Sequence, residues 1–166
     1  MDKKSLKIVN NNLEKKDSKL PSWVKRKLDK SKLVGKSGKV IELASGKKYH
    51  IGNPLNDLTG SQWTHFLRSV FSSRYPTNGK ESYGHKIRKI HPSPKPPQLM
   101  RELIEFFTKE NEFVLDYFMG VGGTLLGASL SGRLAIGIDL QNKFISAYKK
   151  CAKSLNLETQ YTLQGD

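Results

Sequence analysis

The sequence contains a single cysteine, Cys151, and no long apolar run. One cysteine cannot form an internal disulfide, and no group of Cys and His residues has the spacing of a metal site. No stretch approaches about 18 consecutive apolar residues, and the lysine-rich N-terminus lacks the apolar segment of a signal peptide. We therefore expect an intracellular, cytoplasmic protein that has neither a metal site nor a membrane span.

Acidic residues are scarce in the first part of the chain. Residues 1–100 contain 22 Lys and Arg against 7 Asp and Glu, a balance of +15, whereas residues 101–166 contain 7 against 8, a balance of −1. A basic part attached to a near-neutral part predicts a surface for a polyanion beside a domain with another task. A lysine-rich tail that only keeps the chain in solution explains residues 1–37 equally well.

The residue pattern divides the chain into three parts. Residues 1–37 are polar and basic, and we expect a largely disordered arm with one short helix in the stretch PSWVKRKLDK. Residues 38–90 predict a hairpin around Ser45 and Gly46, an amphipathic helix and an exposed basic loop. The helix is expected in LTGSQWTHFLRSVFSS, where apolar residues recur every three or four positions and Thr59 or Ser61 supplies the cap.

Residues 91–166 form the third part and alternate between helical and strand patterns. A helical stripe in PQLMRELIEFFTKE precedes the strand FVLDYF and a helix of small residues. The strand RLAIGIDL, a further helix and the strand YTLQGD follow. Alternation at these lengths predicts an α/β fold with a parallel sheet and right-handed crossovers, here a partial Rossmann-like sheet of about three strands.

The stretch VLDYFMGVGGTLLGA carries the candidate binding site. In an open parallel sheet, ligands bind beyond the carboxyl ends of the strands, where a strand turns into the next helix. Gly120, Gly122 and Gly123 permit the backbone angles and the close approach that this turn requires. Asp116 ends one strand and Asp139 the next, 23 residues later, about the spacing at which an acidic residue accepts the hydroxyls of a ribose.

Three kinds of nucleotide ligand compete for this arrangement. A P-loop needs a lysine after its glycines, and no lysine occurs between Lys109 and Lys143. The dinucleotide motif fits Gly120 and Gly122 but finds Leu125 where its third glycine belongs, which disfavours an NAD-type dehydrogenase. A cationic ligand with a ribose and an amine suits the two carboxylates, and S-adenosylmethionine has all three features. A glycine loop that only turns tightly is the remaining alternative.

Residues 91–140 resemble the amino-group DNA methyltransferases of bacteria and phages, which methylate the exocyclic amine of adenine or cytosine. That family runs from a His-Pro-x-x-Lys-Pro segment through a helix to VLDPFxGxGTTxxAA and GRxxIGIE, in the order found here. Tyr117 replaces the usual proline, and Val121-Gly122-Gly123 replaces the usual Ser-Gly-Thr or Ser-Gly-Ser. The resemblance implies a Rossmann-like methyltransferase domain, S-adenosylmethionine as cofactor, double-stranded DNA as partner, and a role in restriction-modification.

The resemblance also implies roles for individual residues. It places the methionine part of the cofactor against a wall of Asp116, Phe118, Gly120 and Gly122, with the hydroxyl and amide of Thr124 at the helix start. It assigns Asp139 to the ribose and Asp166 to the adenine amine. The segment that closes over the methionine end corresponds to His91, Pro92, Lys95 and Pro96.

The catalytic motif of that family is not found in this sequence. The motif, [Asp/Asn/Ser]-Pro-Pro-[Tyr/Phe], holds the target amine and stacks on the flipped base, and NPLND at 53–57 lacks its second proline and its aromatic residue. We therefore assign no catalytic residue and expect this chain to supply the cofactor half of a site-specific DNA methyltransferase, inactive alone, with the motif on a downstream segment or second chain. The alternative is a non-catalytic DNA- or partner-binding remnant. The target base, the recognition sequence and the oligomeric state stay open.

Overall fold

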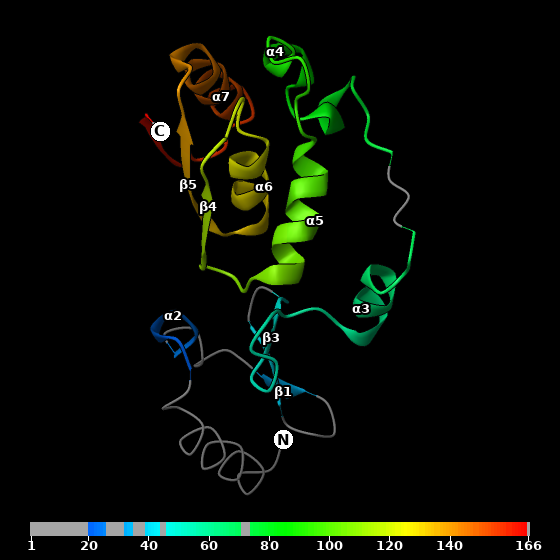
Figure 1. Ribbon diagram of the computed structural model, residues 1–166. Helices are drawn as coiled ribbons and strands as arrows, with labels where there is room; N and C mark the ends of the chain where they lie inside the picture. Colours follow the sequence, from blue (N-terminus) through cyan, green and yellow to red (C-terminus); the bar gives the residue numbers. More distant parts are fainter. Residues whose placement is uncertain (1–19, 26–31, 35–38, 44–45, 71–73, 166) are drawn as a thin grey trace, which may run out of the picture. The chain divides into compact units, whose positions relative to one another are not determined.

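The computed structural model describes residues 20–25, 32–34, 39–43, 46–70 and 74–165 (Figure 1). The chain divides into two compact units, Met1–Asp57 and Leu58–Asp166; the finer three-part division stays a prediction. No helix among the described residues is long and apolar enough to cross a bilayer. In the same part of the chain, no group of three His, Cys, Asp or Glu side chains is placed to hold a metal ion.

The first unit is a small antiparallel sheet with one short helix. Its strands pair in the order β1-β2-β3, and Leu20, Val24, Ile41, Leu43 and Tyr49 form its core. Its elements are α2 (Ser22–Lys25), β1 (Lys32–Val34), β2 (Val40–Glu42) and β3 (Lys48–His50).

The hairpin predicted around Ser45 and Gly46 is confirmed as β2 and β3, with Gly46 in the left-handed region at φ +78°. Strand β1 falls within the stretch predicted to be a disordered arm. Val34 is β-branched and favours a strand, and β2 offers β1 an edge on which to pair. The helix predicted in PSWVKRKLDK corresponds to α2. Residues 1–19, 26–31 and 35–37 of the arm lie outside the described residues.

The second unit is built on three parallel strands in the order β4-β5-β6. This confirms the predicted α/β fold with a partial parallel sheet. The strands are β4 (Phe113–Asp116), β5 (Leu134–Asp139) and β6 (Tyr161–Gln164). The helices are α3 (Gly60–Phe66), the 3-10 turn η3 (Lys80–Ser82), α4 (His85–Arg88), α5 (Pro97–Phe107), α6 (Gly123–Ser131) and α7 (Asn142–Ser154).

Helix α3 is shorter than the apolar stripe predicts. The predicted cap is confirmed, since the Thr59 hydroxyl accepts the N–H of Gln62 while the Gln62 side chain accepts the N–H of Thr59. The Trp63 and Phe66 rings pack on Phe106 of α5 at centroid distances of 4.9 and 4.7 Å. The helix ends at Phe66 and Val70 is exposed, so only the part of the stripe that meets α5 is helical.

Helix α6 lies between β4 and α5, as Figure 1 shows. It consists of small and apolar residues, and Leu125, Leu126 and Ala128 are fully buried because α6 is covered on both sides. Gly127 permits the close approach of α5, since a Cβ at this position would lie 2.8 Å from the backbone nitrogen of Arg101. Helix α7 completes this core with Tyr148, Cys151 and Ala152.

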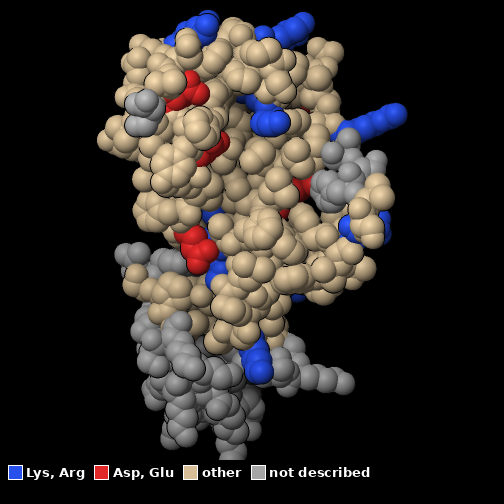
Figure 2. Space-filling view, in the orientation of Figure 1, with Lys and Arg blue, Asp and Glu red and all other residues tan. Residues whose placement is uncertain are grey.

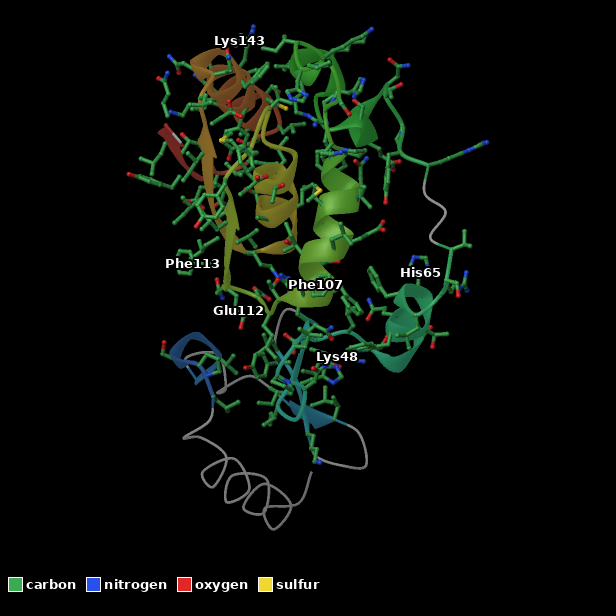
Figure 3. The ribbon with its side chains drawn as sticks, in the orientation of Figure 1. Lys48, His65, Phe107, Glu112, Phe113 and Lys143 are labelled. Atoms are coloured by element: carbon green, nitrogen blue, oxygen red, sulfur yellow. The ribbon has the colours of Figure 1, made fainter. Side chains whose placement is uncertain are left out.

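The two faces of this sheet differ. One face, which includes Val114, Ala135 and Gly137, packs on the core of α6 and α7. The other face, here called the open face, carries large exposed or partly exposed apolar side chains, and Phe113 lies on the side of β4 away from α6 (Figure 3). The parallel register places its members side by side: Phe113, Leu115, Leu134, Ile136, Ile138, Tyr161 and Leu163.

Candidate functional site

The loop between β4 and α6 turns over the carboxyl ends of β4 and β5. Asp116 ends β4, and its Oδ1 accepts the N–H of Phe118 at 3.1 Å. The N–H of Met119 donates to the Ile138 carbonyl of β5 at 3.0 Å. Gly120 and Gly122 have φ values of +50° and +71°, which side chains rarely permit. These bonds and angles fix the loop at the edge where ligands of parallel sheets bind.

Asp139 joins this loop to the end of β5. Its Oδ2 accepts the N–H of Gly120 at 2.8 Å, and its Oδ1 accepts the N–H of Gln141 at 2.8 Å. A carboxylate has about four acceptor positions, so two backbone bonds leave capacity for further donors. The half-buried carboxylate therefore shapes the loop and is also available to the hydroxyls of a ligand.

The segment from His91 to Lys95 lies directly on the glycine loop. A Cβ on Gly120 would come within 3.4 Å of the His91 imidazole, and one on Gly123 would lie 2.6 Å from the Lys95 carbonyl oxygen. The His91 Nδ1 accepts the N–H of Ser93 at 3.1 Å, and its ring meets Phe144 of α7 edge-on at 4.9 Å. Glycine at position 123 thus allows the segment to approach the loop, whereas a Cβ at position 120 would make an ordinary contact with His91.

Arg88 ties this segment to the core. The side chain is only 1 % exposed; Nη1 donates to the Lys95 carbonyl at 2.7 Å, and Nε donates to the Tyr83 carbonyl at 3.3 Å. Burial lowers the pKa of the Arg88 guanidinium, with the neighbouring Cys151 acting in the opposite direction. A buried cation is costly unless it is hydrogen-bonded, so these bonds hold Tyr83 and Lys95 in fixed positions.

Cys151 packs beside Arg88 and is fully buried. A Cβ on Gly84 would lie 2.4 Å from its Sγ, so glycine is needed for α4 to pack on α7. Burial raises the pKa of the Cys151 thiol, and Arg88 lowers it by a smaller amount. The raised pKa keeps the thiol protonated near neutral pH, as in a structural rather than a reactive cysteine.

Two adjoining hollows lie at this edge of the second unit. The site cavity, of about 100 Å³, lies between the 91–95 segment and the glycine loop. A larger hollow, here called the α5–β4 groove, has about 490 Å³ and runs between α5 and β4. Lys95, Asp116, Phe118 and Thr124 line both, and Phe118 is 91 % exposed. The two hollows are therefore neighbours that share one wall.

Six of the residues assigned from the sequence line the site cavity: His91, Lys95, Asp116, Phe118, Gly120 and Thr124. Asp139 adjoins it through its bond to Gly120. Pro92, Pro96 and Gly122 are not among its lining residues. Gly122 lies against the Tyr148 ring, which a Cβ would meet at 2.2 Å. Asp166 lies outside the described residues. The ligand contacts assigned to all of these residues stay predictions.

Sequence reasoning missed Arg88 and Tyr148. Arg88 appears in the sequence as one basic residue among several, and hydrogen bonds to backbone carbonyls leave no residue pattern. Tyr148 supports Gly122 with its ring and accepts the N–H of Gln160 at its hydroxyl, at 2.8 Å. The only sequence signal for Tyr148 is its place on the apolar side of α7, which does not distinguish a support of the glycine loop from ordinary core.

The chemistry of the cavity suits a ligand with both signs of charge. Gly123 and Thr124 begin α6 and line the cavity, so the positive end of the helix dipole lies there, which favours an anionic group. The Asp116 carboxylate, also in the lining, favours a cation. Asp139, which adjoins the cavity through its bond to Gly120, adds a carboxylate that can accept hydrogen bonds. An amino-acid moiety joined to a sugar has the groups that this arrangement could hold.

On the face shown in Figure 2, the described basic residues are dispersed. In the view of Figure 2, lysine and arginine side chains lie singly and are separated by uncharged surface. Many lysines of residues 1–37 lie outside the described residues. The polyanion surface expected from residues 1–100 therefore stays a prediction.

Known proteins that resemble this chain include DNA methylases. The family model described as DNA methylase matches residues 2–150. The type II methyltransferase M1.MboII of Moraxella bovis is 34 % identical over 104 residues, which are 63 % of this chain and 36 % of that protein. The putative methylase YubD of Escherichia coli K12 is 46 % identical over 54 residues, 32 % of this chain and 24 % of that protein. The chain thus spans about a third or less of the length of these relatives.

One solved structure with a similar fold is a putative DNA modification methylase from Thermus thermophilus, complexed with S-adenosyl-L-methionine. Its TM-score is 0.48 and its sequence identity 24 %, over 66 % of this chain and 39 % of that one.

Proposed function

The chain belongs to the DNA methylase family, and we propose that it binds S-adenosylmethionine and supplies the cofactor half of a DNA methyltransferase. The target in this proposal is an exocyclic amine, adenine N6 or cytosine N4, in double-stranded DNA of a bacterial or phage cytoplasm. The observation that carries the proposal is Asp139, whose carboxylate closes the glycine loop at the carboxyl edge of the sheet.

The residues present fit the cofactor part by part. A cavity of about 100 Å³ is smaller than the several hundred Å³ of a whole nucleotide pocket, so it receives the methionine end alone. The carboxylate of the methionine part would lie at the start of α6 near Thr124. The ammonium group of the same part would lie near Asp116. Asp139 would accept hydrogen bonds from the hydroxyls of the ribose. Phe118, which is exposed, supplies an apolar wall.

When bound, the cofactor supplies an electrophilic methyl group on a sulfonium centre. The residues of this chain would bind and orient it. The 91–95 segment, held by the bond from Arg88 to the Lys95 carbonyl, would cover the methionine end and exclude water. The chain supplies no recognisable group that holds a flipped base, so we expect no methyl transfer to mixed-sequence DNA from residues 1–166 alone. Radiolabelled methyl transfer by this chain alone would contradict that expectation.

Calorimetric titration with S-adenosylmethionine, or with its demethylated product, tests the cofactor proposal. We expect binding that Asp139→Ala weakens by about 1–3 kcal/mol, or roughly 5- to 150-fold, because ribose hydroxyls lose their acceptor. Asp139→Asn keeps one acceptor oxygen and should weaken binding less. Glu158→Ala, at an exposed carboxylate in the same unit, is the matched control and should leave affinity unchanged.

Thermal unfolding of the same variants separates lost binding from a collapsed loop. Absence of heat with either ligand at millimolar concentration, together with heat on addition of NAD, would refute the proposal. A non-catalytic remnant that still holds the cofactor would bind it as proposed. It would remain inactive with every added methylase segment.

The excess of basic residues in residues 1–100 supports DNA as the partner. We expect weak, sequence-tolerant duplex binding that falls roughly a hundredfold between 50 and 200 mM salt, if about four phosphates are neutralised. Deleting residues 1–19, which leaves the core residues Leu20 and Val24 in place, should flatten this salt dependence. Fluorescence anisotropy with a labelled duplex measures both, and an unchanged slope after the deletion would show that residues 1–19 take no part in DNA binding.

A further inference from the structure

We infer that exposed lysines of α4 and α7 form a phosphate-binding surface that holds double-stranded DNA beside the candidate cofactor site. This surface, here called the lysine face, consists of Lys86, Lys89, Lys143, Lys149, Lys150 and Lys153, all of which are exposed. The inference rests on the proposed function, because it names where the DNA of that proposal is held. It also places DNA contacts in residues 101–166, whose 7 Lys and Arg against 8 Asp and Glu predict none.

The charges of the second unit are segregated along the chain. Residues 82–100 and 140–157, which contain α4 and α7, hold eight Lys and Arg and no Asp or Glu. Residues 101–139, between these two segments, hold three Lys and Arg against six Asp and Glu. The near-neutral balance of residues 101–166 therefore conceals a strongly basic helix, α7, that follows an acidic stretch.

The two basic segments lie side by side in the fold. A Cβ on Gly84, at the start of α4, would meet the Cys151 sulfur of α7, and the His91 ring contacts Phe144 near the start of α7 at 4.9 Å. The chain from Gly84 to His91 thus runs along α7, and Figure 1 shows α4 next to α7. In Figure 2, blue side chains project from the upper edge of the molecule, the end at which α4 and α7 lie in Figure 1.

The four lysines of α7 share the outer side of the helix. At about 3.6 residues per turn they occupy roughly a third of its circumference, opposite the buried Ile145, Tyr148 and Ala152. Lys143 lies on the side of α7 away from α6 (Figure 3). The outer surface of α7 and the exposed lysines of the adjoining α4 therefore form one positively charged surface.

No acidic group neutralises this surface within the described residues. None of the six lysines forms an ion pair there, whereas Arg101 of α5 pairs with Glu105 at 2.9 Å. Lys143 contacts only the Phe144 ring, at 5.1 Å from its nitrogen to the ring centroid. Unpaired lysines that lie close together raise the local positive potential, which attracts a polyanion.

Helix stability does not explain the pattern. Lys143 lies in the first turn of α7, where the helix dipole disfavours a cation, and that turn contains no acidic residue. Lys149 and Lys153 are four residues apart, a spacing at which like charges destabilise a helix. Only Lys153, in the last turn, is favoured by the dipole. The charges therefore point to a ligand outside the chain rather than to the fold.

The lysine face begins at the edge of the candidate cofactor site. Helix α7 starts at Asn142, three residues after Asp139, and His91 of the site cavity adjoins Phe144. From Lys143 to Lys153 the helix rises by about 15 Å, and duplex DNA carries one negative charge per about 1.7 Å of its axis. A duplex on this face would therefore present several phosphates to the lysines, with one end of the contact beside the site that holds the methyl donor.

Fluorescence anisotropy with a labelled duplex tests the inference through a triple variant, Lys86→Gln/Lys143→Gln/Lys150→Gln. We expect its dissociation constant at 100 mM salt to rise roughly tenfold and its salt slope to fall by about two, since each lost phosphate contact removes about 0.9. The matched control Lys39→Gln/Lys47→Gln/Lys48→Gln removes the same charge from exposed lysines of the first unit. The control should weaken binding by less than about threefold.

A second variant and a positional readout keep the test independent of folding. Lys149→Gln/Lys153→Gln, on the same face, should weaken duplex binding in the same direction, and thermal unfolding should show both variants folded. In the ¹⁵N-labelled chain, added duplex should shift the amides of α4 and α7 more than those of the acidic helix α5. Shifts confined to the first unit would overturn the inference.

Further outcomes would also overturn it: no duplex binding by the chain, unchanged affinity and slope in the triple variant, equal losses in the control, or tighter binding of a folded RNA through the same lysines. Titration of S-adenosylmethionine into the same variants separates this inference from the proposed function. Cofactor binding with an inert lysine face refutes only the inference. Duplex binding through the lysine face by a chain that binds no cofactor refutes the proposed function and leaves the inference in place.

Discussion

The two faces of the β4-β5-β6 sheet are made from the same strands but belong to different environments. On the packed face, Ala135 and Gly137 lie under α6 and α7, where Leu125 of α6 and Tyr148 of α7 are fully buried. On the open face, Phe113 and Leu115 are exposed although they are equally apolar. The packed face stabilises the unit and holds the glycine loop, whereas the open face contributes little to this unit alone and is available to a partner.

Truncating one leucine on the packed side of the sheet and one on the open face should give the largest difference in the free energy of unfolding. Leu125→Ala should lower the free energy of unfolding by about 2–5 kcal/mol, because it leaves a cavity between α6 and the sheet. Leu115→Ala, on the open face, should cost less than about 1 kcal/mol because its side chain is already half in water. Urea unfolding of the two variants measures the difference, and equal losses would show that the open face is covered within this chain.

A glycine pair tests how the packed face holds the loop. Gly122→Ala should lower the free energy of unfolding by more than about 2 kcal/mol, because the new methyl group meets both a positive φ and the Tyr148 ring. Gly132→Ala has nearly the same φ, +72°, but its nearest neighbour is the flexible Glu110 side chain at 3.5 Å. It should therefore cost about 1 kcal/mol. Similar losses in thermal unfolding would mean that the contact with Tyr148 does not restrict the loop.

Arg88 connects the buried core to the 91–95 segment of the candidate cofactor site. Arg88→Lys keeps the charge but not the two directed bonds to Tyr83 and Lys95, so we expect about a tenfold loss of cofactor affinity from a loosened 91–95 segment. Lys89→Met, at the exposed neighbouring residue, is the control. The decisive readout is amide exchange of Ser93 and Lys95, which should quicken in Arg88→Lys alone. Unchanged exchange with weakened binding would contradict the positioning role.

Alkaline pH gives the smallest expected effect. Burial raises the pKa values of both Cys151 and Tyr148 in the packed core, so the folded state holds these protons more tightly than the unfolded state. Their contribution to stability is complete below the unfolded thiol pKa of about 8.5 and declines as pH rises above it. Cys151→Ala should reduce this decline in urea titrations between about pH 8 and 10. An identical decline in the variant would assign it to other groups.

The sequence predicts the elements of the packed face and the glycine loop better than it predicts the open face. Alternating strands and helices, the cap at Thr59 and the glycine loop between Asp116 and Asp139 are local patterns, and the structure contains each of them. The open face leaves no such signal, because FVLD has the same apolar run as a strand buried on both faces. Local pattern also fails for Gly122, which packs against Tyr148 from a distant helix, and for Arg88, whose partners are backbone carbonyls.

The most direct test of the account is to locate the cofactor on the chain by nuclear magnetic resonance. In ¹⁵N-labelled residues 1–166 titrated with the demethylated cofactor, the amides of Phe118, Gly120, Gly123 and Gln141 should shift most, since they surround Asp116 and Asp139. Amides of the open face, such as those of Phe113 and Tyr161, should move little. Saturable shifts centred on the open face or on the first unit, or none at millimolar ligand in a folded chain, would contradict a cofactor site at the carboxyl edge of β4 and β5.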